Sequence, residues 1–208
     1  MRPRIFPDVF TMAKEPRVNA LLSGHSFVRR LQEFITRSSD DRFLDTLNLR
    51  ETCNISWQGT GGRTVARVQR FDMGVITAFR PAILGLDLGS NDICDPRRSP
   101  LSVARSIMTL VKNAFEEMDV QFIIVCQVLH RKKPPYSFYN DNVNKLNRYL
   151  KNALQEVAYA TLWRHRGLSN PSINIFHDDG IHLNYMGHKA LYKSYRGAIL
   201  YALKRLHH

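Results

Sequence analysis

The stretch that decides the fold reads Leu21-Leu22-Ser23-Gly24-His25-Ser26-Phe27-Val28-Arg29-Arg30. The apolar run Val18–Leu22 precedes Gly24, and apolar residues with helical spacing follow it. This order predicts a buried strand, a tight turn and a helix over Phe27–Thr36. A serine at such a turn lies at the carboxyl edge of a parallel sheet, where open α/β folds place their sites. Ser26 is therefore either a nucleophile beside a helix N-terminus or a simple N-cap.

The rest of the chain alternates between strand-like and helix-like segments. Strands are expected over Thr52–Trp57, Ala82–Leu88, Val120–Leu129 and Ile173–Phe176, and helices over 64–79, 101–118, 139–160 and 187–206. Alternation of this kind predicts a parallel sheet covered by helices on both faces. We expect an irregular lead-in over residues 1–17 and one domain over residues 18–208.

The composition narrows the function classes. The 208 residues carry a formal net charge of +12, which favours nucleic acid, an anionic membrane surface or anionic substrates as partners. The basic residues are scattered along the chain and form no tail. Three widely spaced cysteines argue against a disulfide framework or a zinc site: Cys53, Cys94 and Cys126. With no apolar signal core and no membrane-length apolar run, we expect an intracellular, cytoplasmic protein.

Polar clusters follow the predicted strands: Gly24-His25-Ser26, Gly61-Gly62-Arg63-Thr64, Gly89-Ser90-Asn91-Asp92 and Asp179-Gly180-Ile181-His182. The carboxyl ends of parallel strands share one edge, so these clusters should meet there. Their residue types suit acyl transfer. Ser26 needs a base, and His182 can serve as one. Asp179, three residues before His182, can hold the imidazole in the correct tautomer.

A tetrahedral oxyanion also needs hydrogen-bond donors. The candidates are the backbone N–H groups of Ser26 and Gly62 and the side-chain amide of Asn91. A glycine at position 62 would let the backbone approach a reacting centre closely, because it has no Cβ. We expect Asp92 to cap or brace the neighbouring turn.

The base and its partner have alternatives nearby in the sequence: His177, Asp178 and His188. The three-residue spacing favours Asp179 over Asp178, and His188 falls inside the predicted last helix. A metal site built from residues 177, 178, 179 and 182 has suitable ligand types. That site would leave Ser26 and Asn91 unexplained, so we expect neither a metal nor a cofactor.

Taken together, these clusters resemble the SGNH (GDSL-type) hydrolase family, which is named for Ser, Gly, Asn and His in four sequence blocks. Ser26 matches the nucleophile of the first block, Gly62 the second block and Asn91 the third. Asp179 and His182 match the fifth block, within Asp179-Gly180-Ile181-His182-Leu183-Asn184. One position departs from the family pattern, because the usual Gly-Asp-Ser is Gly-His-Ser here. This variant looks like esterase-like domains of some animal retroelement proteins.

The resemblance implies a three-layer α/β/α sandwich with a parallel, flavodoxin-like sheet of about five strands. It also implies metal-free hydrolysis of an ester carried by a small molecule, a lipid or an acylated glycan. His25, His130 and Arg131 are candidates for the substrate mouth. The alternative function is a catalytically weak module that binds nucleic acid or an anionic membrane within a larger assembly.

Overall fold

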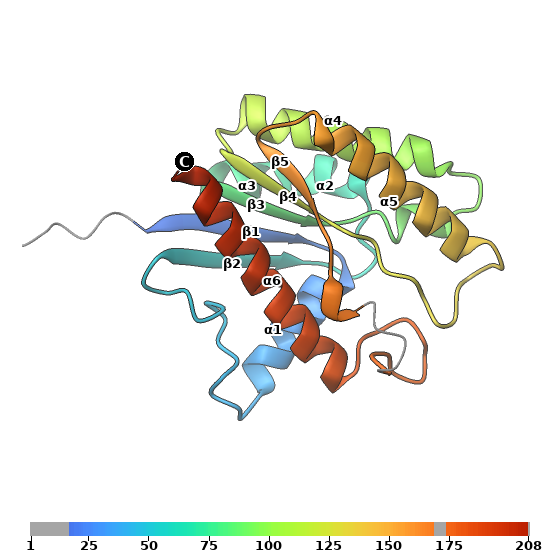
Figure 1. Ribbon diagram of the computed structural model, residues 1–208, viewed down its shortest axis with the longest axis horizontal. Helices are drawn as coiled ribbons and strands as arrows, with labels where there is room; N and C mark the ends of the chain where they lie inside the picture. Colours follow the sequence, from blue (N-terminus) through green and yellow to red (C-terminus); the bar gives the residue numbers. More distant parts are fainter. Residues whose placement is uncertain (1–16, 169–173, 208) are drawn as a thin grey trace, which may run out of the picture.

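The structure is a computed structural model that describes residues 17–168 and 174–207. Five strands form a single parallel sheet in the order β2-β1-β3-β4-β5 (Figure 1). They are β1 (Val18–Gly24), β2 (Cys53–Gly59), β3 (Ile83–Asp87), β4 (Phe122–Cys126) and β5 (Ala160–Trp163). This is the flavodoxin-like strand order, so the predicted fold class is confirmed. The proposed lead-in, residues 1–17, lies almost entirely outside the described part of the chain.

Helices cover both faces of the sheet and make a three-layer α/β/α sandwich (Figure 1). One face carries α1 (Ser26–Arg37) and α6 (Tyr185–Leu206). The other carries α2 (Val65–Phe71), α3 (Met73–Phe79), α4 (Pro100–Glu117) and α5 (Tyr139–Gln155). Two short 3-10 turns complete the set, η1 (Asp92–Cys94) and η2 (Arg166–Leu168). None of the helices described here is long and apolar enough to span a bilayer.

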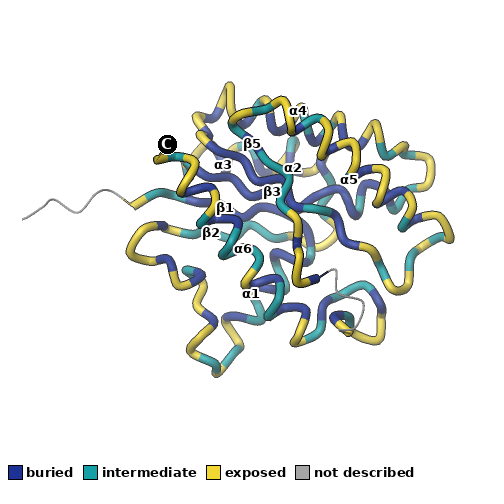
Figure 2. Tube along the Cα trace, viewed as in Figure 1, coloured by how far each residue is buried: buried dark blue, intermediate teal, exposed yellow. Residues whose placement is uncertain are grey.

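The central strands are buried on both faces, which explains their continuous apolar sequences (Figure 2). Along β4, Phe122, Ile124 and Cys126 pack in the core beneath α1 and α6. The alternate residues Ile123 and Val125 pack in the core beneath α2 to α5. The pleat of a strand thus assigns successive side chains to two separate cores. Cys126 is a core residue, as its position in the apolar run indicated.

Two predicted elements were wrong. The helix predicted over residues 139–160 ends at Gln155, and the fifth strand is Ala160–Trp163. No Gly or Pro separates the two elements, so the apolar pattern of the helix runs on toward the strand in the sequence. The strand predicted over Ile173–Phe176 is not part of the sheet. Phe176 forms only an isolated antiparallel bridge with Leu183, and Ile173 lies outside the described residues.

A third difference concerns the segment 64–79, which forms two helices, α2 and α3, that meet at Asp72. Asp72 is buried, and its Oδ1 lies 2.9 Å from Nη2 of Arg63. Burial raises the pKa of Asp72, and the charge of Arg63 opposes that rise. A buried carboxylate needs a charged partner. The partner of Asp72 is Arg63, which follows Gly62, so the break between α2 and α3 lies next to the Gly62 loop.

Candidate active site

Hydrogen bonds tie together the loops that follow β1, β2 and β3. The N–H of His25 donates to the carbonyl of Asp87 at 3.2 Å, and the N–H of Thr60 donates to the carbonyl of Gly24 at 3.0 Å. The Asn91 side-chain amide donates to the carbonyl of Arg63 at 3.1 Å. Three of the sequence clusters are therefore brought together at the carboxyl edge of the sheet, as the parallel order requires.

Ser26 is the first residue of α1 and is half-buried. It does not cap the helix, because the N-cap is His25, whose Nδ1 accepts the N–H of Phe27 at 3.3 Å. The simple N-cap interpretation of Ser26 is therefore wrong. The hydroxyl of Ser26 lies at the positive end of a twelve-residue helix, where negative charge is favoured.

His25 does not border a substrate mouth, as the sequence had suggested, because it is only 3% exposed. Its Nε2 lies 3.1 Å from Oδ1 of Asp87, and the hydroxyl of Tyr195 donates to the other oxygen, Oδ2. Burial works to raise the pKa of Asp87. The charge and hydrogen bond of His25, the charge of His165 and the hydroxyl of Tyr195 outweigh burial, so this pKa lies below its usual range.

The loop before α6 brings Asp179 and His182 together. Oδ2 of Asp179 lies 2.7 Å from Nδ1 of His182, and Oδ1 accepts the backbone N–H groups of Ile181 and His182, each at 2.8 Å. Desolvation works against ionisation of Asp179. These hydrogen bonds outweigh it and hold the pKa of Asp179 well below its usual range. The carboxylate is thus ionised and oriented by its own loop, with the imidazole as its partner.

The alternative residues occupy different positions. Asp178 is exposed, and its backbone carbonyl, not its carboxylate, accepts a hydrogen bond from Nζ of Lys133 at 2.6 Å. His188 is buried in α6 and stacks on Phe34 with ring centroids 5.1 Å apart. Burial, helped by the charges of His177, Arg30 and His182, lowers the pKa of His188 to about 4. His188 is therefore neutral near pH 7 and enclosed by the α1–α6 contact.

Within residues 17–168 and 174–207, no hydrogen bond connects the Ser26 hydroxyl with His182. Both residues are nevertheless attached to the same helix pair, because Ser26 begins α1 and His182 lies just before α6. Phe34 of α1 packs against Tyr185 of α6 with ring centroids 5.6 Å apart. Catalytic hydrogen bonds are often long in a protein without substrate and tighten in the complex.

Gly62 and Asn91 lie on the adjoining loops. Gly62 has φ +68°, and a Cβ added there would meet no atom within 4 Å. Steric crowding by the protein therefore does not explain a glycine at this position. The left-handed backbone conformation does, because a residue with a Cβ rarely adopts it. Asn91 is half-buried and uses its amide nitrogen to donate to the Arg63 carbonyl, which leaves one N–H of that amide available.

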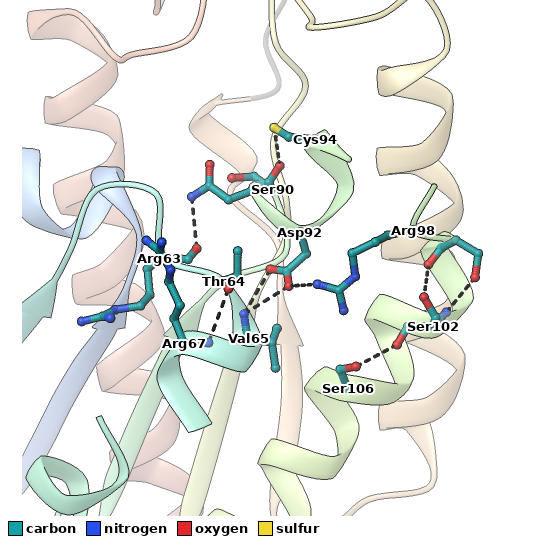
Figure 3. Close-up of polar contacts among 12 residues, drawn as sticks. Arg63, Thr64, Val65, Arg67, Ser90, Asp92, Cys94, Arg98, Ser102 and Ser106 are labelled. Atoms are coloured by element: carbon teal, nitrogen blue, oxygen red, sulfur yellow. Dashed lines mark hydrogen bonds and ion pairs between the residues drawn. The ribbon is translucent and has the colours of Figure 1, made fainter. Parts of the chain in front are cut away.

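Asp92 braces this region, as expected (Figure 3). Its two carboxylate oxygens each accept the N–H of Val65 at 3.2 Å, and Oδ1 also lies 2.7 Å from Nη1 of Arg98. Burial raises the pKa of Asp92, while the Val65 N–H and Arg98 act in the opposite direction. Asp92 thereby fixes the start of α2 next to the Gly62 loop.

The loop after β4 supports the Asp179 loop from the side. The N–H groups of Lys132 and Lys133 donate to the Gly180 carbonyl at 2.8 and 3.2 Å. His130 is exposed, with Nε2 2.8 Å from Oδ1 of Asn144, and the Arg131 guanidinium lies over the Tyr139 ring. His130 and Arg131 remain candidates for the mouth. In the described part of the chain, no group of three or more His, Cys, Asp or Glu side chains is arranged to hold a metal ion.

Sequence reasoning missed two buried residues: Asp87, the partner of His25, and Tyr195, which donates to Asp87. Asp87 is the last residue of β3, whose other residues are apolar. A carboxylate at the end of a buried strand needs a polar or charged partner, and this signal was present in the sequence. Because Gly24 and Asp87 are register partners in the sheet, the carboxylate lies beside the Ser26 turn.

Comparisons with known proteins agree with this architecture. The family model described as the GDSL-like lipase/acylhydrolase family matches residues 24–190. A search of curated proteins finds no match. Among solved structures, an acetyl esterase mutant with acetate ion is 16% identical, with a TM-score of 0.68 over 91% of this chain and 99% of that one.

Two further structures are similar. A carbohydrate esterase family 3 protein from Talaromyces cellulolyticus is 17% identical, with a TM-score of 0.66 over 90% of this chain and 98% of that one. A GDSL-like lipase from Bacteroides thetaiotaomicron is 14% identical, with a TM-score of 0.67 over 88% of each chain. At these identities the likeness is one of fold.

Proposed function

Because the chain belongs to the GDSL-like lipase/acylhydrolase family, and is thus an SGNH-type carboxylic ester hydrolase, we propose that it cleaves acetyl or other short acyl esters through Ser26, His182 and Asp179. The resemblance inferred from the sequence is confirmed by this family match. The observation that carries the proposal is the 2.7 Å contact between Asp179 Oδ2 and His182 Nδ1, on the loop that leads into α6. It is supported by the packing of α6 against α1, the helix that Ser26 begins. The acetyl esterase structures of the same fold support the short acyl group.

In the first half-reaction, the Ser26 hydroxyl attacks the ester carbonyl while Nε2 of His182 takes its proton. Asp179 keeps the proton of Nδ1 in place and stabilises the imidazolium. The carbonyl oxygen becomes an oxyanion that accepts hydrogen bonds from the N–H of Ser26, the N–H of Gly62 and the free amide N–H of Asn91. The intermediate then expels the alcohol, which receives the proton from His182.

In the second half-reaction, water attacks the acyl group on Ser26. His182 takes a proton from this water, and the same three donors hold the second oxyanion. Collapse of the intermediate breaks the bond to the Ser26 oxygen, which recovers its proton from His182. The products are the carboxylic acid and the starting enzyme.

A fluorophosphonate probe tests this proposal, because it labels serine nucleophiles activated by a neighbouring base. The parent protein should react at one site and hydrolyse p-nitrophenyl acetate faster than longer esters. Ser26→Ala should abolish both properties, and Ser106→Ala, which changes a half-buried serine on α4, should preserve them. Labelling and turnover that survive in Ser26→Ala would refute the assignment.

The alternative function, binding of nucleic acid or an anionic membrane by a catalytically weak member, is supported by the net charge of +12. That charge is spread over many segments, whereas the proposed hydrolase residues are few: Ser26 at the start of α1, Asn91 after β3, and Asp179 and His182 before α6. Retention of a complete set of hydrolase residues favours the enzymatic function.

A further inference from the structure

A groove with a volume of about 950 Å³ lies between β5 and α6, at the edge of the sheet farthest from β2. Figure 1 shows β5 and α6 side by side, and Nε1 of Trp163 donates to Oγ of Ser194 at 3.0 Å. In the described part of the chain, α1 and α6 are the two helices that cover this face of the sheet, and among those residues no further helix lies over the face beside β5.

The floor of the groove is apolar. Its large apolar lining residues are Trp163 of β5, Ile175, and Met186 and Tyr201 of α6. Met186 is 48% exposed and Tyr201 is 41% exposed. An apolar surface of this kind indicates a binding site when polar groups surround it.

The free edge of β5 supplies backbone groups. The N–H of Ile123 donates to the Tyr159 carbonyl at 2.8 Å, and the N–H of Gln127 donates to the Trp163 carbonyl at 2.9 Å. In a parallel ladder, residues alternate between facing the neighbouring strand and facing away from it. Leu162 therefore directs its N–H and C=O away from β4, and no other described residue bonds to them.

The rim of the groove is positively charged: Arg164, Arg166, Lys189 and Lys193. Among the described residues that line the groove, none is acidic. None of these four side chains forms an ion pair with another residue in the described part of the chain. The charge of Lys189 also acts on Asp40, which is not among the residues lining the groove. The groove thus presents net positive charge around an apolar lining.

We propose that this groove binds an acidic protein segment in an extended conformation, which pairs with β5 as a sixth strand. Strand addition uses the outward N–H and C=O of Leu162 for main-chain hydrogen bonds. Alternate side chains of the segment then point to opposite faces, so apolar residues can meet Trp163 and Tyr201 while acidic residues meet the basic rim. A nucleic acid backbone would use the charge but has no means of pairing with a strand edge. This inference does not rest on the proposed hydrolytic function.

The first test is a fluorescence anisotropy titration with a short fluorescein-labelled peptide of alternating glutamate and valine. The parent protein should bind it at low salt, and a lysine–valine peptide should not bind. Lys189→Glu with Lys193→Glu should weaken binding by about tenfold or more, because two attractive charges become repulsive. The matched control, Lys145→Glu with Lys151→Glu on α5, makes the same change of net charge and should leave binding unaffected.

The second test addresses the strand pairing. Two versions of the peptide carry N-methyl groups on one or the other alternate set of residues, which removes the donors on one edge of the strand. One version should lose binding and the other should keep it, and peptide should slow hydrogen exchange at the Leu162 amide. Equal binding by both versions would overturn the proposal.

A competition experiment separates this site from a general polyanion site. If a uridine oligonucleotide or an anionic vesicle competes as strongly as the acidic peptide, and loses binding in the same double variant, the acidic-segment proposal is wrong. Turnover of a small neutral ester should be unchanged in the Lys189/Lys193 variant. Peptide binding is measured without any ester. The binding proposal and the hydrolase proposal can therefore fail independently of each other.

Discussion

Nε2 of His25 lies 3.1 Å from Oδ1 of Asp87, directly beneath the turn that carries Ser26. The other ring nitrogen, Nδ1, accepts the N–H of Phe27, so we assign the ring proton to Nε2, which donates it to Asp87. The His25–Asp87 pair thus links the third strand to the first turn of α1. It explains how a histidine serves at a position where the family usually has an aspartate.

The first prediction concerns this tautomer. In Asp87→Asn, the new amide can donate to Nε2 and move the ring proton to Nδ1, which breaks the bond to the Phe27 N–H. We expect kcat to fall by roughly 10- to 100-fold with KM nearly unchanged, because Ser26 is displaced while the substrate site is intact. Steady-state kinetics and the ¹⁵N shifts of the His25 ring measure the two effects.

Substitutions of His25 provide the control. His25→Asn retains an N-cap oxygen for the Phe27 N–H, so it should keep more of the activity than His25→Ala. Tyr195→Phe removes only the hydroxyl at the other carboxylate oxygen and should lower stability more than kcat. A normal ¹⁵N pattern together with normal turnover in Asp87→Asn would show that the pair does not position Ser26.

The second prediction separates the two neighbouring aspartates. Asp179→Asn should lower kcat by roughly 10⁴, as expected when the partner of a catalytic histidine loses its charge. Asp178→Asn should have little effect, because the hydrogen bond that Asp178 makes with the described residues is to its backbone carbonyl and not to its carboxylate. Single-turnover kinetics on p-nitrophenyl acetate compare the two variants, and a larger loss in Asp178→Asn would reverse the assignment.

The third prediction concerns Asn91. Asn91→Ala should lower kcat by about 10²–10³ with little change in KM, because an oxyanion donor acts on charge that forms in the transition state. Loss of the hydrogen bond to the Arg63 carbonyl should also destabilise the loop slightly. Thermal unfolding measured beside the kinetics distinguishes these contributions. An effect confined to KM would indicate a role in ground-state binding.

Local patterns were sufficient to predict most of the fold. Strands β1 to β4 and helices α1, α4 and α6 have strong periodicity bounded by glycine, proline or polar residues, so their predicted ends lie close to the observed ones. Strand β5 was missed because Thr161-Leu162-Trp163 is short and follows a helix without a break signal. The fold class survives this error, since the alternation of elements is unchanged.

The residues proposed for chemistry could be proposed from the sequence because each occurs in a short motif at the end of a predicted element. The buried support beneath them could not be predicted in this way. Asp87 and Tyr195 are separated by 108 positions, and their contact depends on how α6 packs against the sheet. The meeting of His25 with Asp87 depends on the Gly24–Asp87 register, which a single strand sequence does not specify.

The fourth prediction concerns acid stability. The pKa of His188 is lowered to about 4, chiefly by burial, whereas an unfolded histidine titrates near 6.5. Below pH 6.5 the unfolded chain therefore takes up a proton that the folded chain excludes until about pH 4, so stability is lost as the pH falls through this range. Between pH 7.5 and pH 5 this one group should cost about 2 kcal/mol of the free energy of unfolding.

His188→Phe keeps a ring stacked on Phe34 and removes the titration. Urea unfolding at both pH values should show a smaller loss of stability in this variant than in the parent, by about the same 2 kcal/mol. His207→Phe changes an exposed histidine just after the opposite end of α6 and should behave as the parent does. Parallel losses in the parent and His188→Phe would mean that His188 is not excluded from protonation in the folded chain.

The last prediction concerns the loop after β4, where Lys132 and Lys133 are adjacent but play different parts. Nζ of Lys133 donates to the Asp178 carbonyl at 2.6 Å, while the exposed Lys132 side chain makes no hydrogen bond to the described residues. Gly180 fits tightly here, since a Cβ on it would lie 2.8 Å from the Lys133 nitrogen. The Lys133 side chain thus secures the loop that orients Asp179 toward His182.

Lys133→Met keeps the aliphatic stem and removes one hydrogen bond from a charged donor. It should lower kcat by roughly three- to tenfold, because such a bond at an exposed site is worth about 1 kcal/mol and its loss loosens the Asp179 loop. Lys132→Met removes the same charge and should leave kcat within experimental error. If charge near the substrate mouth were the cause, both variants would lose turnover equally and added salt would abolish the difference from the parent. A loss confined to Lys133→Met and independent of salt assigns the effect to the contact with Asp178, because a hydrogen bond at 2.6 Å is screened far less than a distant charge.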